Sequence, residues 1–243
     1  MRVEAVQTDP VQSEVVQSEV IQSKVVQQPV RVWDLATRVF HWALVILMIV
    51  SFVTAKVNGS WMQWHFYSGF AILSLVSFRL IWGFVGGHYS RFTNFLFSPR
   101  AIIAYLKSSD SAPRTLGHNP LGSLSVYALL FSVAMQATTG LFVNDDISNE
   151  GPLSKFVSNA TVALLTTVHR LNEKFLIALV LLHVAAITFY LIRKKENLIR
   201  PMINGDKLGL SSDPVSTDSA AKKILAALVL AACASIVAWV VRR

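Results

Sequence analysis

Charged residues are scarce in this sequence. Only 15% of its 243 residues are Asp, Glu, Lys or Arg, whereas a typical soluble domain carries about 25%. Hydrophobic residues make up 53% of the chain. So much apolar surface cannot be hidden in one core of a water-soluble fold of this size. The composition therefore excludes an ordinary soluble domain and favours an integral membrane protein.

Cysteine is almost absent as well, since Cys233 is the only one. This excludes a disulfide framework and any iron–sulfur or zinc cluster held by cysteines. The motif Cys-x-x-Cys-His is missing, so a covalently attached c-type haem is excluded. No Gly-x-Gly-x-x-Gly turn follows a strand, which argues against a nicotinamide or flavin site of that kind. The N-terminus lacks a basic region followed by an apolar core, so we expect no cleaved signal peptide.

The chain instead contains long apolar stretches. A helix that crosses a bilayer needs roughly 20 mostly apolar residues. Five stretches come close to this length: 39–55, 66–84, 121–143, 175–192 and 224–241. We therefore expect an all-α, multi-pass membrane protein.

Residues 6–30 form a pentad repeat that reads VQTDP, VQSEV, VQSEV, IQSKV, VQQPV. A period of five fits neither a helix face nor a strand over several units. Because the segment is polar and poor in aromatic residues, we predict a disordered tail over residues 1–30. A weakly β-prone or partner-binding role is the alternative interpretation.

Local signals predict where several helices begin. Asp34 is a suitable N-cap for the first helix, and the third span starts after Asn119–Pro120. The fourth helix is expected to start near Thr161, well before its apolar part. Residues 99–107 are expected to form a short helix on the membrane surface.

The net charge of +8 could indicate nucleic-acid binding. We exclude that interpretation because the basic residues gather beside the spans, where they orient a membrane protein. The connection between spans 3 and 4 is acidic instead, with Asp145, Asp146 and Glu150 against Lys155. We therefore expect a multi-pass membrane protein with a cytoplasmic N-terminus. The basic residues on the cytoplasmic side are Arg91, Arg100, Lys107, Arg114, Arg193, Lys194, Lys195, Arg200 and Lys207.

Four of the six histidines lie on predicted membrane helices: His41, His65, His169 and His183. Such side chains inside spans are costly and usually functional. His169 and His183 are 14 residues apart, so on one helix they point nearly the same way and stand roughly 21 Å apart. The topology then pairs His65 with His169 at the outer level and His41 with His183 at the inner level. Two haems, each held by two imidazoles from different helices, would suit electron transfer.

A histidine in a span is also often a structural group or part of a proton relay, and this alternative applies to each of the four. Arg79 lies toward the inner end of span 2, where it could pair with a haem propionate or extend to lipid phosphates. Arg38 has the same two interpretations. Arg170, beside Lys174, could serve the outer propionates. His88 and His118 are expected at the surface, with contact to a quinone or a propionate as the alternative.

Six segments of the sequence resemble the bacterial cytochrome b561 family, which includes the b-type cytochrome subunits of nickel–iron hydrogenases. Together they cover about 31–207, and their order matches that of the family. The segments are VWDLATRVFHW (32–42), RLIWGFVGGHYSRFTNF (79–95), GHNPLG (117–122), TGLF (139–142), HRLNEKFLIALVLLH (169–183) and ENLIRPMINGDK (196–207).

The resemblance implies a four-helix membrane core with two non-covalent b haems over residues 31–207. It places the haem ligands at His41, His65, His169 and His183. It also implies electron exchange between quinone and a redox partner, such as a periplasmic c-type cytochrome. Residues 1–30 and 208–243, with the fifth span, lie outside it.

Three rival functions remain open at this stage. One is a superoxide:quinone oxidoreductase, because Arg170 and Lys174 would attract an anion to the outer end. The second is a hydrogenase b-type cytochrome subunit. The third is a haem-free transporter or scaffold.

Overall fold

The computed structural model describes residues 27–57, 59–107, 115–145 and 149–243, and most of these residues are helical. Within them, five helices are long and apolar enough to cross a membrane. They coincide with the five predicted stretches, so the all-α, multi-pass prediction is confirmed. The five are α2 (Leu35–Val57), α3 (Met62–Val85), α5 (Pro120–Gly140), α6 (Asn159–Ile192) and α8 (Ala220–Val240).

Short elements connect these helices. The predicted surface helix over 99–107 is present as α4, with those same bounds. The others are mostly single turns and one pair of short strands. The short elements are β1 (Gln28–Arg31), η1 (Gly59–Trp61), η2 (His88–Ser90), η3 (Phe92–Asn94), α4 (Pro99–Lys107), η4 (Ser154–Phe156), α7 (Ile199–Asn204) and β2 (Asp206–Gly209).

Side-chain caps set the starts of the long helices other than α3. Asp34 accepts a hydrogen bond from the Thr37 backbone N–H at 2.8 Å, as expected of the N-cap of α2. Asn119 caps α5 in the same way, with a proline in the first turn. Ser158 rather than Thr161 caps α6, because its hydroxyl accepts from the Thr161 N–H at 3.2 Å. The fourth helix therefore begins at Asn159, two residues earlier than predicted.

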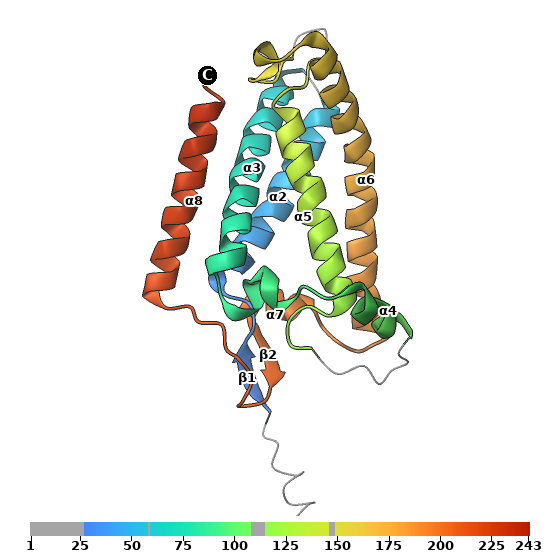
Figure 1. Cartoon of the computed structure of the whole chain (residues 1–243), viewed down its shortest axis with the longest axis vertical. Coiled ribbons are helices and arrows are strands. Elements are labelled where there is room, and N and C mark those ends of the chain that lie inside the picture. Colours follow the sequence, from blue (N-terminus) through green and yellow to red (C-terminus); the bar gives the residue numbers. More distant parts are fainter. Residues whose placement is uncertain (1–26, 58, 108–114, 146–148) are drawn as a thin grey trace, which may run out of the picture.

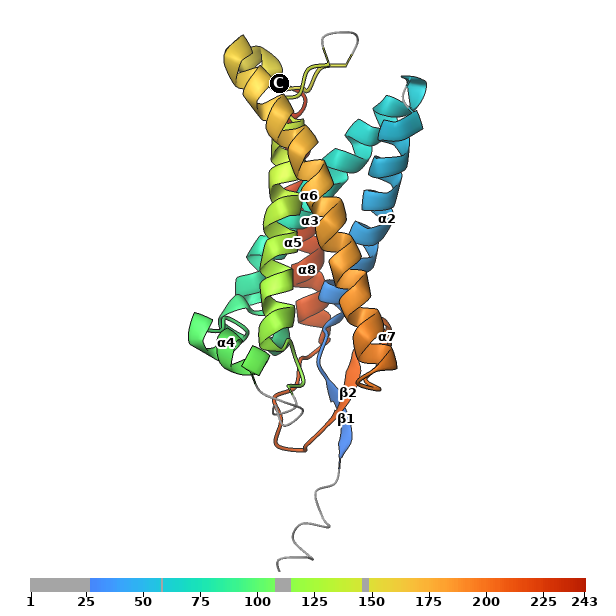
Figure 2. The same ribbon diagram turned by 90° about the vertical axis from the view of Figure 1, so that its right-hand side faces the viewer.

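Helix α3 is the central helix of the bundle. It packs against α2, α5 and α8, and α5 packs against α6. Half of the apolar window of α3 is buried (50%), whereas only 6% of that of α6 is. Figure 2 shows α2 and α3 diverging from α5 and α6 toward the end that carries the α5–α6 connection. Helices α2 and α6 thus face each other across the bundle without packing closely.

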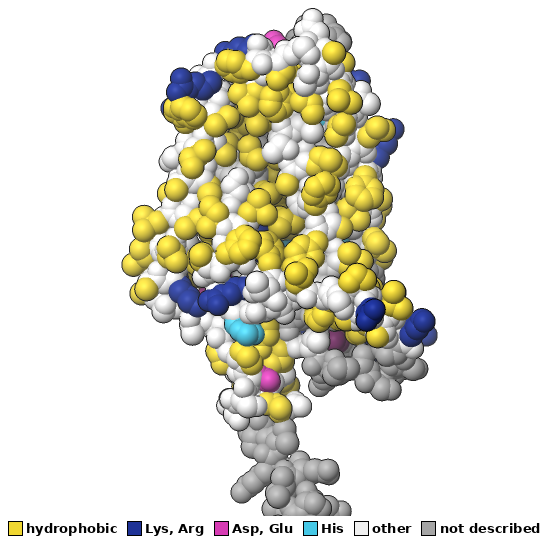
Figure 3. Space-filling view, in the orientation of Figure 1, with side chains coloured by type: hydrophobic (Ala, Val, Ile, Leu, Met, Phe, Trp, Pro, Cys, Tyr) yellow, Lys and Arg dark blue, Asp and Glu magenta, His cyan; other side chains and the backbone are white. Residues whose placement is uncertain are grey.

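Helix α8 lies beside the other four, on the side of α3 (Figure 1). Buried residues of α8, including Cys233, pack with Phe40 of α2 and with Phe78 and Trp82 of α3. The remaining surface of the bundle is largely apolar, as Figure 3 shows for one face. The fifth helix is therefore an addition to a group of four.

Strand β1 pairs antiparallel with β2, with Gln28 opposite Gly209 and Arg31 opposite Asp206. The last residues of the predicted tail, from Gln28, therefore belong to a strand, because β1 gains a ladder of hydrogen bonds from a distant segment. Of the predicted tail, residues 1–26 lie outside the described residues. The pairing draws the segment before α2 and the segment before α8 to one end of the bundle (Figure 1).

Candidate haem site between the helices

The histidine pair that the topology predicts to be outer, called the outer pair below, is formed by the second and fourth spans. His65 lies in the first turn of α3, and His169 lies in the half of α6 that follows the α5–α6 connection. Their ring centroids are 6.5 Å apart and the ring planes are nearly perpendicular, at 88°. The two residues that were paired by depth are therefore neighbours in the structure.

Each outer ring is oriented by a backbone carbonyl. Nδ1 of His65 lies 2.8 Å from the carbonyl oxygen of Ser51, and Nδ1 of His169 lies 3.0 Å from that of Gln136. A carbonyl accepts but cannot donate, so these contacts assign the proton to Nδ1 in both rings. The lone pair then resides on Nε2. This is the usual arrangement of a metal-bound histidine, whose other nitrogen donates to a carbonyl or carboxylate.

Gln136 is a site residue that the sequence reasoning missed. Its side-chain nitrogen lies 3.0 Å from Nε2 of His169, and its Oε1 accepts from Asn172, which also donates to the Ser132 carbonyl. The signal was present in the sequence, because a glutamine inside an apolar span is costly and usually functional. With iron bound to His169, this amide must turn away from Nε2.

Two glycines shape the space beside the outer pair. Gly69 lies one turn beyond His65, and a side chain there would meet nothing within 4 Å. Gly140 instead faces the His169 ring, which would lie 3.1 Å from an added Cβ. The surface of α3 next to His65 is thus open, while α5 holds the His169 ring closely. Such open space is what a flat ring system requires.

The inner pair lies on α2 and α6. His183 is close enough for its charge to act on His41. Nδ1 of His41 is buried and has no hydrogen-bond partner among the described residues. His41 therefore lacks the carbonyl contact that orients the rings of His65 and His169.

Unpartnered nitrogen atoms occur on residues toward the same end of the bundle as this pair. Within the described residues, four buried side-chain atoms lack a hydrogen-bond partner: Arg38 Nε, His41 Nδ1, Arg79 Nη1 and His118 Nδ1. Arg38 lies one turn before His41. His118 is near enough to Arg79 and His183 for their charges to act on it. Buried polar groups are nearly always paired, and leaving one unpaired costs about 1–3 kcal/mol. The two arginines of this set, Arg38 and Arg79, suit an anion, such as the carboxylates of a haem.

Arg79 lies inside the bundle. It is only 4% exposed, and its guanidinium lies over the ring of Phe92, 4.8 Å from the ring centroid. A side chain extended to lipid phosphates would be exposed at the rim, so the lipid interpretation is wrong for this arginine. Arg38 is also largely covered, and it donates to the carbonyl of Ile203 at 2.7 Å.

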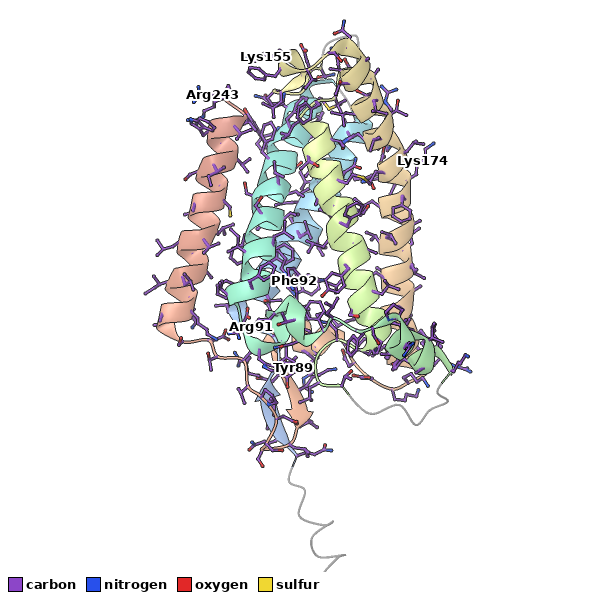
Figure 4. The ribbon with its side chains drawn as sticks, in the orientation of Figure 1. Tyr89, Arg91, Phe92, Lys155, Lys174 and Arg243 are labelled. Atoms are coloured by element: carbon purple, nitrogen blue, oxygen red, sulfur yellow. The ribbon has the colours of Figure 1, made fainter. Side chains whose placement is uncertain are left out.

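The two outer cations lie at the surface. Arg170 is exposed on α6, yet near enough for its charge to act on His169. Lys174 points away from the bundle (Figure 4). Neither side chain enters the space between the helices, so their expected contact with the outer propionates stays a prediction.

His118 is half-buried and its Nδ1 atom is fully covered, so it is not the exposed surface residue that was predicted. Its ring lies between those of Trp33 and Phe95, at centroid distances of 4.7 and 4.6 Å. Burial lowers the pKa of His118 to about 3, and nearby positive charges act in the same direction. The ring is therefore neutral and donates a single N–H. The cause is the next residue, Asn119, which caps α5 and draws the preceding chain across the inner end of the bundle.

His88 is half-buried and meets the ring of Tyr89 edge-on. No group of three or more His, Cys, Asp or Glu side chains in the described residues could hold a metal ion. The histidine pairs alone therefore make no zinc-type site there. They fit iron whose other ligands come from a porphyrin.

Residues 32–205 match the family described as prokaryotic cytochrome b561. The chain belongs to this family. It is a membrane b-type cytochrome, a haem-binding electron-transport protein with transmembrane helices. Members form a four-helix bundle that holds two haems, and the matched range contains α2, α3, α5 and α6 but ends before α8. This assignment overturns the alternative of a haem-free transporter or scaffold.

A relative of this b561-family chain is a probable Ni/Fe-hydrogenase B-type cytochrome subunit from Azotobacter chroococcum mcd 1. The two are 22% identical over 209 residues, which cover 72% of this chain and 87% of the relative. No solved structure matches the chain.

Proposed function

We propose that this cytochrome carries electrons between the membrane quinone pool and a redox partner on the outer side, such as a periplasmic c-type cytochrome. In this proposal His65 and His169 hold the outer haem, and His41 and His183 hold the inner one. The observation that carries it is the outer pair. Two rings from different helices are neighbours, and each donates through Nδ1 to a carbonyl.

The protein's own groups have distinct tasks in this proposal. Ser51 and Gln136 orient the outer rings through their carbonyls. Arg38, Arg79 and His118 supply unpartnered N–H groups for the carboxylates of the inner haem. When bound, haem supplies one-electron redox chemistry, and two axial imidazoles leave no open position for a substrate.

The quinone assignment rests on access. The described segments between the spans are short, and the longest ordered connection contains only single turns and α4. Large apolar side chains are exposed along α2 and α6, for example Ile46, Phe52 and Leu181. A substrate that dissolves in the bilayer can approach these helices directly, whereas a soluble nucleotide has no comparable surface.

The orientation is part of the proposal. The end with β1, β2 and α7 also holds the basic segment that follows α6. Basic connections favour the cytoplasm. We therefore place this end, and the inner pair, on the cytoplasmic side of a bacterial inner membrane.

A second candidate is superoxide oxidation at the outer haem, with quinone as the acceptor. The observation in its favour is the pair of exposed cations, Arg170 and Lys174, on α6 near His169. A hydrogenase-linked role is a further candidate, because the Azotobacter relative is described as such a subunit.

Stopped-flow reduction of the oxidised, haem-loaded protein distinguishes these functions. We expect fast reduction by a quinol analogue and none by NADH, followed through the haem absorption. The double variant Arg170→Gln/Lys174→Gln is compared with the unchanged protein at equal haem content. It should lose a reaction with superoxide but keep the reaction with the uncharged quinol. Fast reduction by NADH alone would refute the proposal. Slow reduction by quinol together with near-diffusional reduction by superoxide, lost in the double variant, would replace it with the superoxide oxidase.

A further inference from the structure

A narrow groove runs between α8 and the inner halves of α2 and α3. Its walls are apolar, and its volume is about 190 Å³. Pockets for drug-sized ligands usually measure about 300–1,000 Å³, so this groove suits a flexible chain better than a ring system. The apolar wall is formed by Val39, Phe40, Leu75, Phe78, Ala226 and Leu230.

Two lysines stand at the cytoplasmic mouth of the groove. Lys222 and Lys223 belong to the first turn of α8 and line its entrance. Neither has a hydrogen-bonding acid partner through its side chain among the described residues. Figure 3 shows Lys or Arg side chains at the lower edge of the apolar surface, beside the foot of α8.

The acidic residues at the same mouth are already engaged. Asp218 pairs with Arg31 and accepts from the Leu35 N–H at 2.7 Å. Asp34 accepts from Ser90 at 2.6 Å and from Trp82 at 3.1 Å. Because both carboxylates already bind other groups of the fold, the lysines make the entrance of the groove positively charged. The amino end of α8 adds to it, because a helix N-terminus favours negative charge.

Depth decides what can occupy such a groove. Lys222 and Leu230 are eight residues apart on α8, so the groove extends roughly 12 Å from the charged mouth into the apolar layer. An occupant must therefore carry a negative group at the membrane surface and an apolar chain below it. Basic pockets between membrane helices on the cytoplasmic side are known to bind anionic lipid head groups.

We propose that this groove binds one anionic phospholipid of the inner leaflet. Its phosphate lies between Lys222 and Lys223, and one acyl chain lies between α8 and the α2–α3 pair. The lipid fills the space at the side of the bundle where the fifth helix joins the four-helix core. The site does not use the haems, but it depends on the proposed orientation, because anionic lipids are concentrated in the cytoplasmic leaflet.

Native mass spectrometry of the intact, haem-loaded protein in detergent tests the proposal. Phosphatidylglycerol and phosphatidylcholine are added in separate titrations. We expect one phosphatidylglycerol to bind more tightly than phosphatidylcholine. In Lys222→Gln/Lys223→Gln the preference should fall by roughly fivefold for each lysine removed. The control Lys107→Gln/Arg200→Gln removes two positive charges at the same end and should keep the preference.

A second pair of variants tests the acyl-chain wall without changing charge. Ala227 lines the groove, whereas Ala232 does not, and both are exposed on α8. Ala227→Leu should weaken binding of phosphatidylglycerol, and Ala232→Leu should not. Equal binding of the two lipids by the unchanged protein would overturn the proposal. So would displacement of the lipid by inorganic phosphate at equal concentration, because that result indicates a simple anion site. The haem content of every variant is measured alongside. Two haems with normal spectra would show that the haem sites are intact, so a failure of the lipid proposal leaves the proposed function standing.

Discussion

Asp34 joins three parts of the inner end of the molecule, and its replacement gives a sharp prediction. The carboxylate is only 2% exposed. It accepts hydrogen bonds from the Thr37 N–H at 2.8 Å, the Trp82 indole at 3.1 Å, the Gly87 N–H at 3.1 Å and the Ser90 hydroxyl at 2.6 Å. The side chain thus fixes the start of α2 against the end of α3 and the turn that follows it.

Asp34→Ala leaves three buried N–H donors without an acceptor, while Ser90 can rotate its hydroxyl. At about 1–3 kcal/mol for each unpaired donor, the free energy of unfolding should fall by roughly 3–9 kcal/mol. This approaches the whole stability of many proteins, about 5–15 kcal/mol. Asp34→Asn keeps one acceptor oxygen for Thr37 and Trp82. It mainly loses the bond from Gly87, which costs about 1–3 kcal/mol.

The assay is thermal unfolding of the purified, haem-loaded protein in detergent, with yield from the membrane as a second measure. Asp34→Ala should accumulate poorly, and Asp34→Asn should melt between that variant and the unchanged protein. Asp213→Ala is the matched control, because this more exposed carboxylate accepts from only the Leu210 N–H. A melting transition of Asp34→Ala equal to that of the control would refute the hydrogen-bond argument.

Further predictions concern the haems and the orientation. His65→Ala and His169→Ala should each remove the same haem in a redox titration, and His41→Ala and His183→Ala should each remove the other. Loss of one haem by both His41→Ala and His65→Ala would contradict the pairing. Arg79→Gln removes a buried cation whose charge acts on His118. If Arg79 serves the inner haem as proposed, the potential of that haem should fall while the outer potential stays constant. A shift of the outer potential alone would contradict this prediction, because it would place Arg79 near the outer haem. Reporter fusions after Asn149 should read as periplasmic and those after Lys195 as cytoplasmic, and opposite signals would invert the assignment of inner and outer sites.

Sequence periodicity and composition were sufficient to place the membrane helices. Apolar runs of span length are decisive because the bilayer imposes one length on every helix. The capping residues Asp34 and Asn119 were also predictable, because a cap acts on the N–H groups two or three residues ahead of it. The pairing of His65 with His169 followed from depth alone. Successive spans run in opposite directions, so the second and fourth spans both begin on the same side of the membrane.

Contacts between distant segments could not be predicted in this way. Strand β1 pairs with β2 across most of the chain, and nothing in either four-residue segment specifies the other. The burial of His118 depends on the rings of Trp33 and Phe95, which come from two other parts of the chain. The contact between Gln136 and His169 depends on the register of α5 against α6, which local patterns do not fix.

The haem content of the purified protein tests the central claim most directly. Protein isolated in detergent should contain about two haems per chain, extractable by acid acetone and with low-spin spectra. This is the result expected of bis-histidine ligation without covalent attachment. A folded but colourless protein would contradict the account. So would a protein with one haem per chain that is retained, with the same potential, in both His41→Ala and His65→Ala.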